Sequence, residues 1–240
     1  MPNITEIVFA LNLGDKVVGV TQNCNYPPEA QKKEKIGRES INLEKVFSLN
    51  PDLIIMLEDA QKKEVLKLRE RGLPVITVNP RTVSEVIDSI VMIGWMTGAT
   101  ADAKAVTDDM KRRIASVEAG IFPLITKKVF MAVGYRPLIG AGGNTFLNDV
   151  IRIAGGDNVL QNMKSPYPEI NFEELYRLNP QYIIIPKGLA DENEILKDRR
   201  WERLNAVKNG RILFIDPDIL FRPGPRIIEA IEEMAKFLKK

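Results

Sequence analysis

The chain contains an internal repeat of domain size. The segment Ile41–Ile55, with the sequence INLEKVFSLNPDLII, returns as Ile170–Ile184, with the sequence INFEELYRLNPQYII, at a constant offset of 129 residues. In each copy an asparagine precedes a short helical stretch, which an Asn-Pro pair stops before an apolar strand. A duplicated helix–strand unit predicts two similar lobes, and two facing lobes would form a cleft.

The repeat extends to both sides of this block in the same order. Gly14–Val17 is echoed by Gly156–Val159 at an offset of 142, and Val75–Pro80 is echoed by Ile212–Pro217 at an offset of 137. A drifting offset is typical of insertions and deletions in surface loops. A period of 129 residues is too long for a solenoid, whose repeats run about 20 to 50 residues.

Strands alternate with helices along the chain. Leu53–Met56 is a continuous apolar run that predicts a buried strand. Residues 83–121 are expected to be helical with interruptions near Gly94 and Gly98, and residues 192–207 to be helical as well. This alternation predicts an α/β fold with parallel sheets.

We expect two α/β lobes. The helical segment between the two copies is either an ordinary surface helix or, as its position favours, a single long helical connector that joins the lobes. The expected ranges are residues 1–97 for the N-terminal lobe, 98–125 for the connecting helix and 126–240 for the C-terminal lobe.

The two halves differ where they begin. The second half opens with an apolar strand, Lys128–Gly134, and the first half has no counterpart of it before Pro2. We therefore expect an N-terminally shortened form, without a leader and without a first strand. A first lobe that is asymmetric by nature is the alternative.

Histidine is absent from the chain, and Cys24 is the only cysteine. These two facts exclude Ser-His-Asp and Cys-His catalysis, metal sites that need imidazole, and an intrachain disulfide. The formal net charge of +2 is spread without a basic block, which argues against a nucleic-acid partner. No apolar run approaches the roughly 18 residues of a membrane span.

Glu44 and Glu173 occupy equivalent positions, two residues after the asparagines of the repeat. A carboxylate in the first turn complements the helix dipole. The same two acids could also bind basic residues on a symmetric partner. Both interpretations are open at this point.

Loops that contain proline carry the other candidate residues. Tyr26 and Tyr167 precede the two repeat helices, and ligands of open α/β sheets bind on such loops; packing against a neighbouring proline is the alternative. Arginine presents a donor fork that suits carboxylate or phosphate, and the arginines in or beside loops are Arg38, Arg136, Arg222 and Arg226. The glycine-rich turn Gly140–Asn144 lacks the spacing of a phosphate-binding motif, so we interpret it as a permissive turn.

Short motifs in a fixed order also carry a family resemblance. They are Pro2–Ile7, Gly14–Val20, Tyr26–Pro28, Asn42–Ile54, Gly143–Phe146, Ala154–Val159, Pro166–Ile170, Trp201–Ile212 and Arg222–Arg226. Together they cover nearly the whole chain, and they resemble the substrate-binding proteins of ABC importers for vitamin B12, ferric siderophores and haem. The cobalamin-binding branch is the most similar.

The resemblance implies an extracytoplasmic protein, periplasmic or lipid-anchored, that clamps a ligand between two Rossmann-like lobes joined by a single long helix. It would deliver this ligand to a transmembrane permease dimer with its ATPase, acting as a monomer without catalysis. The ligand would be cobalamin or, alternatively, a ferric siderophore or haem. The lack of histidine makes capture of a bare metal ion unexpected.

The resemblance also implies roles for individual residues. Glu173 matches a glutamate that docks on the permease; Glu64 is our choice in the first lobe, with Glu44 as the alternative. Leu57 and Thr77 stand where cobalamin binders place tryptophans, so the expected lining is less aromatic. The expected ligand-binding residues are Tyr26, Arg38, Leu57, Tyr135, Arg136, Ile139, Tyr167, Asp218 and Arg222.

Two rival functions are an enzyme on a nitrogenase-like bilobed fold and a sensor ectodomain that does not transport. The enzyme would need cofactor ligands, and only Cys24 is available. We therefore expect a substrate-binding protein that takes a corrinoid first and a ferric siderophore or haem second.

Overall fold

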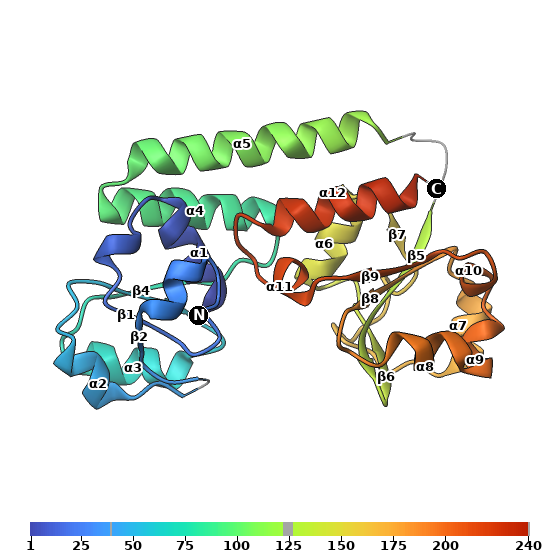
Figure 1. Ribbon diagram of the computed structural model, residues 1–240, viewed down its shortest axis with the longest axis horizontal. Helices are drawn as coiled ribbons and strands as arrows, with labels where there is room; N and C mark the ends of the chain where they lie inside the picture. The colour runs from blue at the N-terminus through green and yellow to red at the C-terminus, as the bar shows by residue number, and fades with distance from the viewer. Residues whose placement is uncertain (39, 122–126, 240) are drawn as a thin grey trace. The chain divides into compact units, whose positions relative to one another are not determined.

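The computed structural model describes residues 1–38, 40–121 and 127–239 (Figure 1). These residues form two compact units, Met1–Met110 and Lys111–Lys240, and each unit is described by itself. The long helix expected between the lobes is α5 (Thr100–Ala119). Residues 122–125 of the expected connector lie outside the described residues.

The second unit is built on one mixed sheet. Its strand order is β6-β5-β8-β9, and β7 pairs with β5; every pairing is parallel except the one between β5 and β6. The strands are β5 (Lys128–Tyr135), β6 (Leu138–Gly140), β7 (Asp157–Asn158), β8 (Tyr182–Pro186) and β9 (Ile212–Ile215). The predicted α/β class with parallel sheets is confirmed.

Helices cover both faces of this sheet, with α6 and α12 along one side and α7 to α10 along the other (Figure 1). Phe130 and Ile183 face the second group, where they pack with the buried Trp201, whose ring meets Phe172 edge-on at 5.5 Å. The helices are α6 (Phe146–Ile153), α7 (Phe172–Leu178), α8 (Glu192–Lys197), α9 (Arg199–Glu202), α10 (Asn205–Lys208), α11 (Pro217–Leu220) and α12 (Ile227–Leu238).

The first unit contains two separate pairs of parallel strands, β1-β2 and β3-β4. Its elements are α1 (Pro2–Ala10), η1 (Gly14–Lys16), β1 (Gly19–Val20), η2 (Pro28–Lys32), β2 (Glu34–Lys35), α2 (Leu43–Ser48), β3 (Ile54–Leu57), α3 (Lys62–Glu70), β4 (Val75–Val78) and α4 (Val83–Thr97). Helix α5 begins in this unit.

The repeat is visible in side-chain detail at the caps of α2 and α7. The Asn42 side chain accepts from the Lys45 N–H at 3.0 Å, and that of Asn171 accepts from the Glu174 N–H at 2.8 Å. Each bond satisfies one of the amides that the first turn of a helix leaves without an intrahelical partner.

The repeat also fixes the register of the strands. Ile54 of β3 pairs with Val75 of β4, and Ile183 of β8 pairs with Ile212 of β9. These pairs are related by the offsets of 129 and 137 found in the sequence. The duplication therefore extends to hydrogen-bonded pairing.

One pair of repeated sequence segments does not form equivalent elements in the structure. Gly14–Lys16 forms a 3-10 helix, whereas Asp157–Asn158 forms β7. In chain order the element that corresponds to β7 is β1, because each lies between the first two helices of its half.

Two helix predictions also need correction. The helix expected over residues 192–207 is three short helices, because the Asp198 and Leu204 backbones are extended and start a new helix each time. Gly94 does not interrupt α4; the helix ends at Gly98, whose φ of 75° suits a glycine cap. A Cβ on Gly94 would overlap Ala103, so this glycine serves the close approach of α5.

The prediction of a buried strand at Leu53–Met56 was wrong for most of its length. Only Met56 is buried, and the side chains of Leu53, Ile54 and Ile55 are half-buried. The equivalent β8 is buried throughout. The difference follows from the neighbours, since β8 lies between two strands and β3 has only one.

Candidate functional site

The loops at one edge of the second unit's sheet bring together several candidate residues. Because β5, β8 and β9 are parallel, their carboxyl ends lie on the same edge. Tyr135 and Arg136 lie at the end of β5, and Asp218 and Arg222 follow β9. Ligands of open α/β sheets bind outside this edge.

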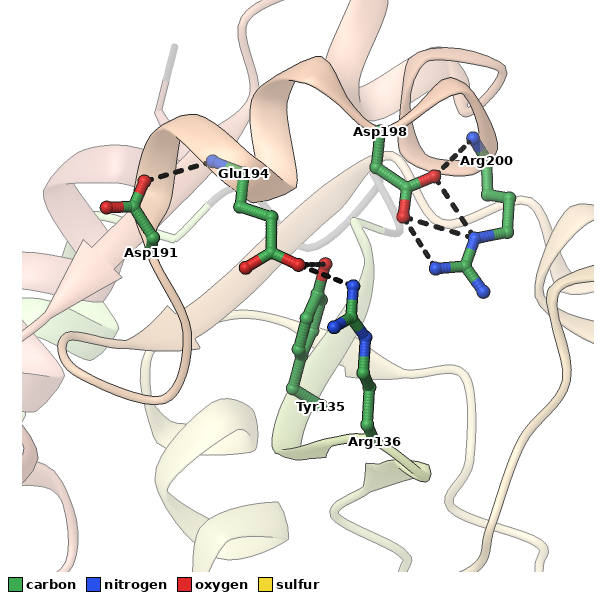
Figure 2. Close-up of polar contacts among 6 residues, drawn as sticks. All are labelled: Tyr135, Arg136, Asp191, Glu194, Asp198 and Arg200. Carbon is green, nitrogen blue, oxygen red and sulfur yellow. Dashed lines mark hydrogen bonds and ion pairs between the residues drawn. The ribbon is translucent and has the colours of Figure 1, made fainter.

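Tyr135 and Arg136 form a compact group with Glu194 of α8, which follows β8 (Figure 2). Arg136 makes an ion pair with the Glu194 carboxylate, and its guanidinium lies over the Tyr135 ring at 4.9 Å. The Tyr135 hydroxyl lies 3.5 Å from the same carboxylate. Burial and the Glu194 charge raise the pKa of the Tyr135 phenol, and Arg136 opposes them.

Two aspartates flank helix α8 (Figure 2). Asp191 accepts from the Glu194 N–H at 3.0 Å, which fixes the first turn. Asp198 ends α8 and binds the Arg200 guanidinium, with an Nη2–Oδ2 distance of 2.6 Å. The hydrogen bonds from Arg200 lower the pKa of the Asp198 carboxyl. Sequence reasoning missed Glu194, which lies 58 residues from Arg136.

Ile139 and Tyr167 are carried by two segments that hydrogen-bond to each other. The Gly140 N–H donates to the Pro168 carbonyl at 3.0 Å, and the Gly142 N–H donates to the Pro166 carbonyl at 2.8 Å. The Tyr167 side chain is 51% exposed, so its ring is available to a ligand. The glycine-rich turn thus serves close backbone packing, since a Cβ on Gly143 would overlap the Gln161 carbonyl.

Asp218 and Arg222 lie on and after α11 and form an ion pair at 2.6 Å. The Arg222 side chain is only 12% exposed. Asp216 accepts from the Asp218 N–H at 2.8 Å and fixes this turn. The arginine is therefore held in place by a short-range partner.

The first unit carries three of the candidate residues. Tyr26 precedes Pro27 through a cis peptide bond and is 43% exposed. Leu57 is the last residue of β3 and is half-buried, and Arg38 is exposed.

A polar network at the carboxyl ends of β3 and β4 was not expected. Asp59 accepts from Asn79 at 2.7 Å and pairs with Arg81 at 2.9 Å. Beside it, the Thr77 hydroxyl donates to Glu58 at 3.3 Å. The position of these residues directly after two predicted strands is the sequence signal that could have found them.

The candidate docking acids lie in the first turns of three helices. Glu64 is half-buried in α3 and lines an open cavity of about 600 Å³. Glu173 in α7 and Glu44 in α2 are exposed. All three positions complement a helix dipole, so the geometry alone fits both interpretations.

Within residues 1–38, 40–121 and 127–239, no group of three or more His, Cys, Asp or Glu side chains could hold a metal ion. In the same part of the chain, no helix is long and apolar enough to cross a membrane.

The model of a known family, described as periplasmic binding protein, matches residues 1–219. The chain belongs to the periplasmic binding protein family. This confirms the resemblance to substrate-binding proteins of ABC importers for vitamin B12, siderophores and haem.

Individual relatives of this periplasmic binding protein agree with that membership. The ABC transporter substrate-binding lipoprotein YvrC of Bacillus subtilis is 36% identical over 98% of this chain and 77% of its own length. A vitamin B12-binding protein of Vibrio cholerae is 28% identical over 99% of this chain and 87% of its own. A crystal structure from Staphylococcus epidermidis, described as a possible iron-binding periplasmic protein, superposes with a TM-score of 0.88 at 29% identity. It covers 100% of this chain and 96% of that one.

Proposed function

We propose that this periplasmic binding protein captures a corrinoid and delivers it to the membrane permease of an ABC importer. The observation that carries the proposal is the stacked Tyr135–Arg136 pair at the loop edge of the second unit, together with the exposed Tyr167 on the segment that hydrogen-bonds to Gly140 of β6. Aromatic rings on fixed loops offer flat apolar surface to a large ligand. The vitamin B12-binding relative supports the choice of ligand.

A ferric siderophore or haem is the second candidate, and the arginines favour it. Arg136 and Arg222 stand on the same edge of the sheet, and an anionic chelate would suit them. The similarity to a possible iron-binding protein supports this alternative. The two candidates differ in charge, because a corrinoid presents mainly neutral amides whereas the chelates present carboxylates or related anions.

Titration of the purified chain with cyanocobalamin, haem and a panel of ferric siderophores tests the proposal. A ligand at one hundred times its Kd stabilises the folded state by about 2.7 kcal/mol, which corresponds to a Tm increase of about 5–10 °C for a chain of this size. Sub-micromolar, one-to-one binding of cyanocobalamin supports the corrinoid. If only an anionic chelate binds, the second candidate replaces it.

Variants locate the binding surface. Tyr26→Ala and Tyr167→Ala should each weaken corrinoid binding about tenfold or more, since each removes an aromatic contact of about 1.4 kcal/mol. Arg136→Ala should act mainly on an anionic chelate. The matched control is Arg177→Ala, because Arg177 is another exposed arginine with a glutamate partner, on α7. An equal loss in the control would contradict the proposed surface.

We further propose that Glu64 and Glu173 dock on the permease, with Glu44 as the alternative in the first unit. A first-turn glutamate can accept a bidentate hydrogen bond from a partner arginine. Glu173→Arg should reduce the ATPase stimulation of the reconstituted importer while ligand affinity is unchanged. Glu202→Arg, at another exposed glutamate of the same unit, is the control.

The proposal places the protein outside the cytoplasmic membrane, as a monomer and without catalytic activity. The lipoprotein relative supports the location. Conversion of any titrated ligand into a product would contradict a role in binding alone. Uptake by cells that carry the importer separates transport from a sensor function.

A further inference from the structure

The loop that carries Tyr26 begins and ends at buried residues. Cys24 is 1% exposed and Ala30 is fully buried, whereas Tyr26 between them is 43% exposed. The loop therefore leaves the core, presents an aromatic ring and returns to the core. Such a loop holds its ring in one place only if both of its ends are fixed, because a loop without bonds at its ends samples many conformations.

Two prolines limit the hydrogen bonds that this loop can make by itself. Pro27 and Pro28 have no backbone N–H. Within the loop, the Ala30 N–H donates to the Pro27 carbonyl at 2.9 Å. The carbonyls of the buried residues at the two ends need donors from outside the loop, since a buried carbonyl without a partner destabilises the fold.

The Lys35 side chain supplies a donor to both ends. Its ammonium group donates to the Cys24 carbonyl at 3.3 Å and to the Ala30 carbonyl at 3.1 Å. The Ala30 carbonyl also accepts from the Lys33 N–H at 3.3 Å. Because an ammonium carries three N–H donors, one side chain can bridge the two ends. Lys35 itself lies in β2 and pairs with Val20 of β1, so the bridge starts from a strand.

Two further contacts act on the same part of the loop. The Gln31 side chain donates to the Asn25 carbonyl at 3.1 Å. The Thr5 hydroxyl donates to the Cys24 thiol at 3.1 Å, and the Thr21 hydroxyl lies 3.2 Å from the same sulfur. The ends of the loop are thus held through three backbone carbonyls and one buried side chain.

We propose that Lys35 and Gln31 are positioning residues for ligand capture, because they hold the loop in the conformation that presents Tyr26. We call these two side chains the loop clamp. The inference rests on the proposed function, in which Tyr26 contacts the ligand. A ligand that meets a fixed ring does not have to order the loop, so the free-energy cost of binding is lower. Neither clamp residue has to touch the ligand for this effect.

Cys24 allows the clamp to be measured without any ligand. It is the only cysteine of the chain, and its buried thiol reacts with dithionitrobenzoate when the end of the loop opens. Lys35→Met removes the donors and keeps an unbranched side chain, whereas Lys35→Arg keeps donors at this position. The matched control is Lys32→Met, because Lys32 is an exposed lysine of the neighbouring η2.

Lys35→Met should speed the labelling of Cys24 at least about tenfold, and the rate should depend little on urea at low concentrations, because the opening of a loop exposes little surface. Labelling through global unfolding would instead accelerate steeply with urea. Lys35→Arg should react more slowly than Lys35→Met. Lys32→Met should react like the unmodified chain.

A double-mutant cycle with cyanocobalamin tests the link between the clamp and Tyr26. Lys35→Met alone should weaken binding by about three- to tenfold, since the ligand must then order the loop. In a Tyr26→Ala background the same substitution should change the Kd less than about twofold, because the ring that the clamp positions is absent. A lysine that supported only the overall stability would have the same effect on the Kd in both backgrounds.

Three outcomes overturn the proposal. The first is unchanged labelling of Cys24 in a folded Lys35→Met protein, and the second is equal acceleration by Lys32→Met. The third is equal weakening of cyanocobalamin binding with and without Tyr26. If Lys35→Met does not fold, Gln31→Ala takes its place in both measurements, and the same results have the same meaning.

The two measurements also separate this inference from the proposed function. If cyanocobalamin does not bind, the cycle is run with the haem or ferric siderophore that does. Failure of every one of these ligands to bind would overturn the proposed function together with the positioning role. Binding that is lost equally in both backgrounds would overturn the positioning role alone.

Discussion

The repeat supplies a matched pair of substitutions, Ile54→Ala and Ile183→Ala. The two isoleucines are equivalent in sequence and each pairs with the first residue of the next strand. They differ in burial, because Ile183 is fully buried and Ile54 is half-buried. The pair therefore isolates the contribution of the surroundings from that of residue type and register.

The expected losses in the free energy of unfolding follow from this difference in burial. Replacing isoleucine by alanine removes about three methylene equivalents at about 0.8 kcal/mol each. For Ile183 the full transfer term of about 2.4 kcal/mol applies, and the cavity left in a closed core increases the loss to about 3–4 kcal/mol. For Ile54 about half of the transfer term applies, because its half-buried side chain already borders a cavity of about 610 Å³, so we expect about 1–1.5 kcal/mol.

Urea unfolding measures both losses, with far-UV circular dichroism for the chain and Trp201 fluorescence, in a Trp95→Phe background, for the second unit, where the Trp201 side chain is fully buried. The midpoint of the transition that belongs to each unit is compared with the unmodified protein. Equal losses within about 0.5 kcal/mol would refute the reasoning from burial, given the usual additivity error.

Three other perturbations have expected outcomes. Arg113 of α5 donates two hydrogen bonds of 2.8 and 2.7 Å to Glu232 of α12, and these bonds lower the pKa of the Glu232 carboxyl in the folded protein. The stability that this contact gives to the folded state is present above the ordinary glutamate pKa. It is lost as the pH falls through the lower pKa of the folded state. Glu232→Gln should thus cost about 0.5–1 kcal/mol at pH 7 and flatten the dependence of Tm on pH below about 4.5, and an unchanged pH profile would contradict this. Gly94→Ala should destabilise by about 1–3 kcal/mol in thermal unfolding, although alanine favours helices, because its Cβ would overlap an alanine of α5; a stabilised variant would show that the two helices can separate. Glu194→Gln should lower the pKa of Tyr135, read from the alkaline change in tyrosine absorbance, because it removes a nearby negative charge; an unchanged or higher pKa would contradict this, since both the charge and the hydrogen bond that the Tyr135 hydroxyl donates favour the protonated phenol.

Local signals in the sequence predicted much of the fold. The caps at Asn42 and Asn171 and the strands β4 and β9 follow from residue types at fixed spacing. The two offsets of the repeat, 129 and 137, also carry the register of the strand pairs. Such features depend on a few neighbouring residues, which is why periodicity and capping rules reach them.

Other features depend on what lies opposite in space. A continuous apolar run at Leu53–Met56 indicates a central strand. No local property of the sequence shows that, among the described strands, β3 pairs with β4 alone. Asp198 divides a stretch of helix-forming residues because its side chain caps the next helix. The Glu194 partner of Arg136 lies 58 residues away, so sequence spacing cannot identify it.

The contact between Arg136 and Glu194 has a consequence for ligand choice. This guanidinium is already engaged, with a carboxylate at its edge and the Tyr135 ring against its face. A negatively charged ligand that reaches it must compete with Glu194, so part of the new attraction is offset by the attraction given up. A ligand whose periphery carries neutral amides can contact Arg136 and Glu194 without displacing one from the other. Glu194 therefore weakens the binding of anionic ligands at Arg136 more than the binding of ligands that present neutral amides.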